Sequence, residues 1–234
     1  MTGTAAPSAP ALLRAVQFAD SMFPVGAFSF SNALESAVEL GVVDDLASLR
    51  EFVATAMQVA ATGDGIAVLV AHRAARAGDA ELVRRADEAV YQRKLNEELR
   101  TMTVRMGRKL AEASAHIVDD PVLRARAAEV AAGTVQGTYP VGLGVLFAVQ
   151  GLPEQDAFAV HQHGVAVMVL GAALRLMRVR HLDAQAVLYE LNQGVGEQYA
   201  RVASAGLDDM ATFAPVLDVL AAAHTKAHVR MFMN

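Results

Sequence analysis

Apolar residues recur at three- and four-residue spacing along most of the chain, and glycine, proline and aspartate residues interrupt the pattern. Such spacing places the apolar side chains on one face of a helix. Within a helix expected from about residue 46 to 60, the face consists of Leu49, Phe52, Val53, Ala56 and Met57. Further helices are predicted over residues 12–19, 34–40, 64–77, 80–117 with an interruption near Tyr91, 121–132, 153–177 and 184–203, with a last one after Asp208–Asp209. The pattern predicts an all-α protein, a single-domain helical bundle of about eight to ten helices.

Three glycines inside the predicted helices indicate close packing. Gly107 lies within helix 80–117, where glycine costs about 1 kcal/mol relative to alanine, so we expect another backbone to approach closely there. Gly164 and Gly171 are seven residues apart in helix 153–177 and therefore share a face. We expect helix 153–177 to be central and a second helix to pack against that face at short distance.

Residues 20–35 are predicted to form a compact turn between two helices. Phe23–Pro24 ends the first helix, because the residue before a proline avoids the α region and proline has no amide hydrogen. The turn carries apolar residues where a solvated loop is usually polar, namely Met22, Phe23, Val25, Phe28 and Phe30. Two interpretations are open: these side chains fill the chain's own core, or they form a partner surface.

The composition agrees with helix packing and excludes several classes of protein. Hydrophobic residues make up 54% of the 234 residues but aromatic residues only 6%, so the apolar mass is mainly aliphatic. A net charge of -5 and a pI near 5.8 argue against a nucleic-acid-binding protein, which needs a basic face. The longest uninterrupted apolar run, residues 164–174, is shorter than the ~20 residues of a membrane-spanning helix.

The chain divides into three predicted parts. Residues 1–10 are small and polar, without a basic start or an apolar segment, so we expect them to be disordered and to carry no export signal. Residues 11–222 are expected to form the helical domain. Residues 223–234 are expected to dock on a partner, because apolar residues follow a basic stretch there. The absence of cysteine excludes disulfides and thiolate metal sites and is compatible with the cytoplasmic location that we predict.

No catalytic motif is found in the sequence. It has no GxxxxGK[ST] phosphate loop, no GxSxG nucleophile elbow and no HExxH zinc motif, so we do not expect an enzyme. His224 and His228 are four residues apart and could face one ion, but two ligands give only labile binding, so no stable metal site is predicted. The alternative from another class is an all-α small-molecule enzyme or sensor that uses His161, His163 or His181 in a pocket.

Two segments resemble signatures of a known family. Phe23-Pro24-Val25-Gly26-Ala27-Phe28-Ser29, followed by Ser31 and Leu34-Glu35, is similar to the N-terminal signature of the UreF family of urease accessory proteins. Glu98-Leu99-Arg100, followed by Arg105-Met106-Gly107-Arg108, resembles a second UreF signature. Later matches are partial. Of a Gly-Gln-Thr-x-Gly-Gln element only Gln185 remains, and the C-terminal tail keeps His224, Arg230 and Phe232 but lacks the usual acidic residue and Arg-Ser ending.

The resemblance implies an all-α accessory protein for urease maturation. Such a protein would be a homodimer that bridges UreD (also called UreH) and the nickel-carrying GTPase UreG, so that nickel passes into apo-urease. It would bind no stable cofactor, and Ni(II) would contact it only transiently. The alternative within this class is a UreF-like paralogue that serves another metalloenzyme. The residues that we expect at partner or dimer interfaces are Phe23, Pro24, Val25, Gly26, Phe28, Ser29, Phe30, Arg100, Arg105, Gly107, Gln185, His224, Arg230 and Phe232.

Overall fold

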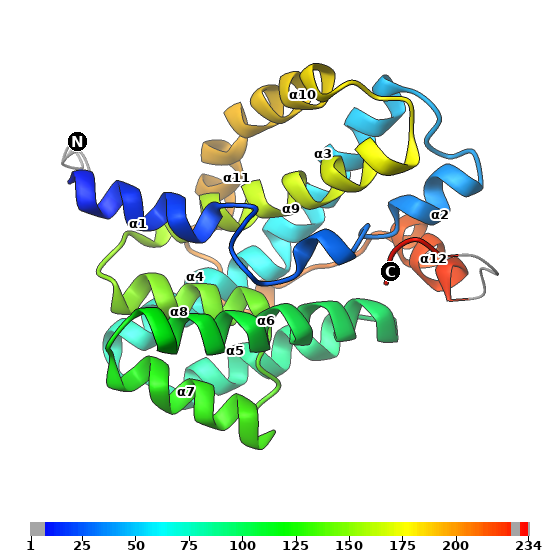
Figure 1. Ribbon diagram of the computed structural model, residues 1–234. Coiled ribbons are helices and arrows are strands. Elements are labelled where there is room, and N and C mark those ends of the chain that lie inside the picture. The colour runs from blue at the N-terminus through cyan, green and yellow to red at the C-terminus, as the bar shows by residue number, and fades with distance from the viewer. Residues whose placement is uncertain (1–7, 226–229, 234) are drawn as a thin grey trace.

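Helix α9 (Glu154–Leu176) runs through the middle of the computed structural model, which describes residues 8–225 and 230–233 (Figure 1). Helices α3 (Leu46–Thr62), α4 (Asp64–Ala77) and α8 (Tyr139–Val149) pack against α9, and α10 (His181–Gln193) covers another side of it. Its 23 residues contain ten buried side chains, among them Phe158, His161 and Gln162. The position of α9 agrees with its predicted role as the central helix.

A second group of helices packs against α4 and α8. Helix α5 (Ala80–Arg93) lies against α4, α6 (Glu97–Ile117) lies against α8, and α7 (Pro121–Ala132) packs on α6. Helix α8 is therefore covered on several sides, which explains why its sequence is apolar all round. It approaches α4 closely at Gly144, where an added Cβ would lie 2.4 Å from the Val68 carbonyl oxygen.

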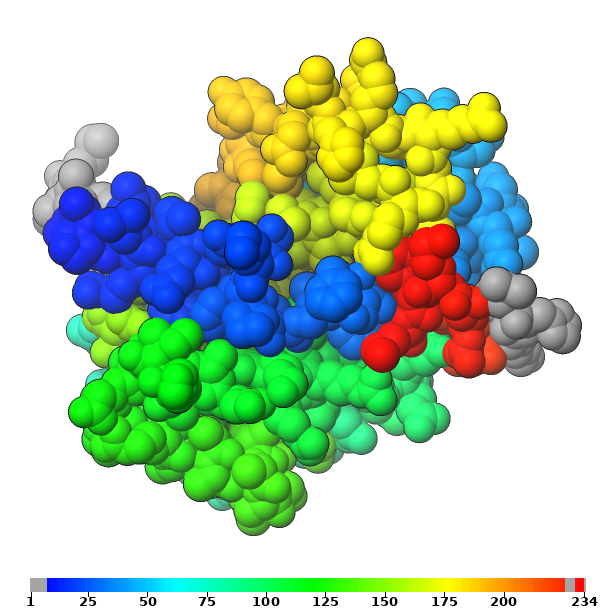
Figure 2. Space-filling model, viewed as in Figure 1, coloured from blue at the N-terminus to red at the C-terminus, as the bar shows by residue number. Residues whose placement is uncertain are grey.

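The N-terminal segment, residues 9–39, and the C-terminal residues lie on one face of the molecule. Helix α1 (Ala9–Ala19) and the 3-10 helix η1 (Ala27–Ser29) lie along α9, and α2 (Leu34–Glu39) contacts α12 (Pro215–His224). Figure 2 shows the N-terminal segment as a blue band between the green and the yellow parts of the chain, with the red C-terminal residues at its end. The remaining elements are α11 (Val195–Val202), which follows α10, and the 3-10 helix η2 (Leu207–Asp209).

The predicted all-α fold class is confirmed. The described residues form twelve α-helices and no strand, and ten of these helices have ten or more residues. Two predicted helices are each divided in two. Helix 80–117 is interrupted at residues 94–96, where Asn96 caps α6 by accepting from the Leu99 amide at 2.9 Å, and 184–203 is interrupted at Gly194. Helix α1 begins at Ala9, two residues inside the segment predicted to be disordered, and residues 1–7 lie outside the described part of the chain.

The three glycines have different surroundings. An added Cβ at Gly107 would lie 1.9 Å from the Gly137 carbonyl oxygen, so the predicted close approach of another backbone is confirmed. An added Cβ at Gly164 or Gly171 would meet no atom within 4 Å. The prediction that a helix packs closely against these two glycines is therefore wrong. They line a pocket instead.

Two helical stretches are long and apolar enough to cross a membrane by length and composition, Leu46–Ala77 and Glu154–Leu176. In the folded chain 61% and 56% of their most apolar windows are buried inside the protein. Core helices of this kind pass the same test as membrane spans, so the finding is weak evidence for a membrane.

Candidate functional site

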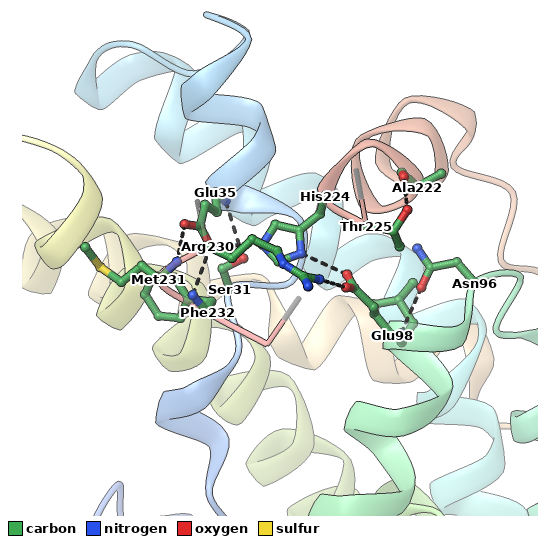
Figure 3. A network of polar contacts seen from close by, with 11 residues as sticks. Ser31, Glu35, Asn96, Glu98, Ala222, His224, Thr225, Arg230, Met231 and Phe232 are labelled. Carbon is green, nitrogen blue, oxygen red and sulfur yellow. Dashed lines mark hydrogen bonds and ion pairs between the residues drawn. The ribbon is translucent and has the colours of Figure 1, made fainter. Parts of the chain in front are cut away.

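Glu35 binds the C-terminal residues to the start of the fold (Figure 3). It lies in α2 and is only 8% exposed. Its carboxylate accepts from the Met231 amide at 2.6 Å and from the Phe232 amide at 3.0 Å. Burial by itself would raise the pKa of Glu35, but these hydrogen bonds and His224 outweigh it and leave the pKa below its ordinary value. A buried carboxylate is thus stabilised by donors that come from the other end of the chain.

His224 lies between two carboxylates and is fully buried. Its Nε2 is 3.0 Å from Glu35 Oε2, and its Nδ1 is 2.8 Å from Glu98 Oε2. A ring with an acceptor at each nitrogen donates to both only when it is protonated, so this geometry suits an imidazolium. Glu98 Oε1 also accepts from Arg230 Nη1 at 2.9 Å. We call Glu35, Glu98, His224 and Arg230 the C-terminal latch.

The latch changes the interpretation of the predicted histidine pair. Both ring nitrogens of His224 face carboxylates on opposite sides of the ring, so these groups do not converge on one point where an ion could sit. His228 lies outside the described residues. Among the residues that the structure does describe, no group of three or more histidine, aspartate or glutamate side chains could hold a metal ion.

Two left-handed residues precede α2 and place Glu35. Asn32 has a φ of 53° and Ala33 a φ of 68°, a conformation that alanine rarely adopts. The buried Ser31 hydroxyl accepts from the Glu35 amide at 3.3 Å and so helps to begin the helix. The left-handed conformation of Asn32 and Ala33 turns the chain so that the first residues of α2, Leu34 and Glu35, are buried. The family-like segment that contains Ser31 therefore positions Glu35 for its contacts in the C-terminal latch.

The apolar turn divides its side chains between the core and the surface. Phe23 and Phe30 are 8% and 3% exposed, and Phe23 packs edge-on against Phe18 with ring centroids 5.1 Å apart. Phe28 is 73% exposed and Met22 is 88% exposed. The core interpretation is therefore confirmed for Phe23 and Phe30, whereas the partner surface stays a prediction for Phe28 and Met22.

The last described residues pack against the turn. The Met233 amide donates to the Ser29 carbonyl oxygen at 2.9 Å. The Phe232 ring is 5% exposed and lies 4.0 Å below the guanidinium of Arg175, which also donates to the Phe28 carbonyl oxygen at 2.6 Å. Phe232 therefore packs inside its own chain, whereas the side chain of Met231 is 60% exposed.

A groove of about 790 Å³ brings the two family-like segments together. One side comes from the turn and the other from α6. Its lining includes six of the residues predicted at interfaces, namely Val25, Gly26, Ser29, Phe30, Arg100 and Arg105. Arg108, Lys109 and Met233 line it as well. We call it the α6 groove; it presents four cationic side chains on a chain whose net charge is -5.

Other predicted interface residues lie elsewhere. Gly107 packs against the loop between α7 and α8, and Gln185 is exposed on α10, outside the α6 groove. Pro24 is exposed in the turn. Of the alternative histidines, His181 is exposed at the start of α10, whereas His163 contacts Asn192 Nδ2 at 3.2 Å through its Nδ1.

Sequence reasoning missed a buried carboxylate that fixes the loop against Gly107. Asp87 is 1% exposed and accepts from the amides of Gly137 and Thr138, each at 2.8 Å, and from the Thr138 hydroxyl at 2.6 Å. Arg126 lies 3.3 Å away. The sequence did offer one sign of this buried carboxylate, because Asp87 lies on the apolar face of α5. Its partners are some 50 residues further along the chain and could not be identified from spacing.

Comparisons with known proteins agree with the family that the two segments resemble. The family model described as UreF matches residues 43–192. The urease accessory protein UreF 2 of Brucella canis is 54% identical over 227 residues, which cover 97% of this chain and 93% of that protein. The urease accessory protein UreF of Yersinia pestis is 49% identical over 224 residues, which cover 95% of this chain and 98% of that protein. The turn lies outside the family-model match but within the length that these relatives share.

Proposed function

Because this chain belongs to the UreF family of urease accessory proteins, we propose that it is a non-catalytic scaffold required for nickel insertion into apo-urease. In this proposal it bridges UreD (UreH) and the GTPase UreG, acts as a homodimer within that complex, and works in the cytoplasm. GTP hydrolysis belongs to UreG. The absence of a phosphate-loop motif from this sequence supports that division of labour.

The observation that carries the proposal is the exposed Phe28, whose chain neighbour Ser29 lines the α6 groove. Phe28 is 73% exposed, and other residues of the same turn line a groove that carries four cationic side chains. Aromatic residues and arginine are enriched in partner interfaces, so this combination supports a binding surface. The turn and the C-terminal residues are joined by the Met233–Ser29 hydrogen bond, so the two segments assigned to partners form one continuous surface. We propose that UreD binds this surface.

Co-purification with UreD and UreG tests the proposal. Phe28→Ala removes an exposed ring and should leave the thermal melting temperature nearly unchanged while it weakens capture of UreD at least tenfold. Tyr189→Ala is the matched control, because Tyr189 on α10 is also 73% exposed but lies away from the turn. Equal capture by wild type and the Phe28 variant would contradict the assignment of the turn. Failure of wild type to bind either protein would contradict the scaffold function.

Transient contact with Ni(II) is a further part of the proposal. His224 would have to leave Glu35 and Glu98 before it could bind a metal, so the latch opposes a resident ion. Calorimetric titration with Ni(II) should therefore show weak binding at most. If the titration is the same after both His224 and His228 are replaced by alanine, these histidines are not where nickel makes contact.

A further inference from the structure

A pocket of about 380 Å³ lies between α9 and the N-terminal segment. The end of α1, the turn and η1 form one wall, and α6 and the start of α8 contribute to another. Apolar side chains dominate the lining, and three of them are the flexible methionines Met102, Met106 and Met168. Pockets for small molecules have this size and character, with a few polar groups on apolar walls.

The two glycines of α9 leave room in this pocket. Gly164 and Gly171 both line it, and an added Cβ at either would meet no atom within 4 Å. At Gly107 and Gly144, by contrast, an added Cβ would collide with another backbone. Within the described part of the chain, no atom comes within 4 Å of the Cβ positions on the glycine face of α9, so the space in front of this face belongs to the pocket.

His161 contributes a buried polar group without a partner to the same pocket. It is 3% exposed, and its Nδ1 has no hydrogen-bond partner among the residues that the structure describes. The Tyr139 ring packs beside it with 6.4 Å between the ring centroids. Burial lowers the pKa of His161 to about 4, so the ring is neutral at pH 7 and offers one donor and one acceptor. Buried polar atoms are nearly always paired, so an unpaired one in a pocket indicates a missing partner.

Each charged side chain that lines the pocket already has an ion-pair or hydrogen-bond partner within the chain. Asp64 forms an ion pair with Lys94 at 2.7 Å, and Asp20 accepts from the Met22 amide at 2.8 Å. Arg175 donates to the Phe28 carbonyl oxygen and lies over the Phe232 ring. The lining of the pocket therefore favours an uncharged molecule over an ion.

We propose that this pocket binds a small, mainly apolar, uncharged molecule whose single hydroxyl or N–H group pairs with His161. The apolar part fills the space in front of Gly164 and Gly171, and the methionine side chains adjust to its shape. A hydroxyl suits either tautomer of the imidazole, because it both donates and accepts. The inference does not rest on the proposed role in urease maturation, although Phe28 lines this pocket and also belongs to the surface proposed for UreD.

Binding of 2-naphthol to the full-length protein tests the proposal by calorimetry and by the fluorescence of the probe. Wild type should bind one molecule per chain saturably. Gly164→Leu should abolish binding, because the new side chain enters the pocket without a collision at its Cβ. Gly196→Leu is the matched control. Gly196 also lies in a helix with no atom within 4 Å of an added Cβ, but it does not line the pocket, so that variant should bind as wild type does.

The hydrogen bond is tested separately with His161→Phe, which keeps a ring but removes its nitrogens. Binding of 2-naphthol should weaken about tenfold, whereas 2-methylnaphthalene, which lacks the hydroxyl, should bind wild type and variant equally. Thermal melting of each variant checks that it is folded. The proposal is overturned if wild type shows no saturable binding, if folded Gly164→Leu still binds, or if His161→Phe leaves the affinity for 2-naphthol unchanged.

Discussion

Glu35 shows how one residue connects distant parts of the chain. It sits at residue 35, but its amide donors are at residues 231 and 232 and its imidazole partner is at 224. The family resemblance places Glu35 in a motif, yet nothing in local spacing predicts that a C-terminal histidine binds it. The same holds for His224, whose predicted role as a metal candidate rested on its distance from His228. Residue roles that depend on contacts across the fold are thus the part that sequence periodicity does not reveal.

Glu35→Gln should loosen the C-terminal latch. The amide keeps the shape of the carboxylate but brings an NH2 group toward donors, so at least one buried donor loses its acceptor. We expect the free energy of unfolding to fall by about 2 kcal/mol in urea denaturation, and the Met231 and Phe232 amides to exchange hydrogen faster. Glu190→Gln breaks the exposed pair with Arg50 and should leave stability unchanged.

The same variant carries a pH signature. The folded pKa of Glu35 is lowered, so its contribution is present above the ordinary value of 4.5 and is lost as the pH falls through the folded pKa. The stability difference between wild type and Glu35→Gln should therefore be full at pH 7 and shrink below about pH 4.5. Glu98, His224 and Arg230 remain in both proteins. A difference that is the same at pH 7 and at pH 3 would mean that the carboxylate charge does not hold the tail.

At the scale of elements, the sequence predicted most helices because each is bounded by a local signal. Helix α4 has the expected bounds, 64–77, with Gly78 in a left-handed conformation at its end. Helix α9 differs from the expected range by one residue at each end. The division of 184–203 was missed, because Gly194 keeps right-handed helical dihedrals and gives little sign of a break. Which glycine faces a backbone and which faces a pocket could not be predicted, because that depends on the partner element.

Gly107 and Gly164 offer a matched test of this difference. Both are helical glycines, so alanine should favour the helix at either position by up to about 1 kcal/mol. At Gly107 the new methyl group would meet the Gly137 carbonyl oxygen and the Thr138 backbone, which Asp87 fixes in place. We expect Gly107→Ala to lower the free energy of unfolding by about 2 kcal/mol net, and Gly164→Ala to raise it slightly. Equal effects in urea denaturation would contradict the packing described for α6.

At the scale of the whole molecule, the contacts of the C-terminal residues with the turn and α2 make the tail part of the fold. The predicted tail begins at residue 223, but His224 belongs to α12 and Phe232 fills a site under Arg175. The sequence of the tail indicated apolar side chains that would have to be buried by another surface. Phe232 is buried by residues of its own chain. Met231 and Met233 keep half or more of their side chains exposed, so the outer side of the tail is free to contact a partner.

A chain that ends after Thr225 separates these two roles of the tail. It retains α12 and His224 but removes the Phe232 ring and the two amide donors of Glu35. Loss of one large buried aromatic side chain costs about 3 kcal/mol or more, so the melting temperature should fall while helical circular dichroism is retained. Capture of UreD should be lost.

Because lower stability alone could weaken capture, Phe232→Ala is compared with Met231→Ala. The first should reduce stability, and the second, at a 60% exposed position, should reduce capture of UreD without lowering stability. A shortened chain that still co-purifies with UreD would show that the tail serves only the fold.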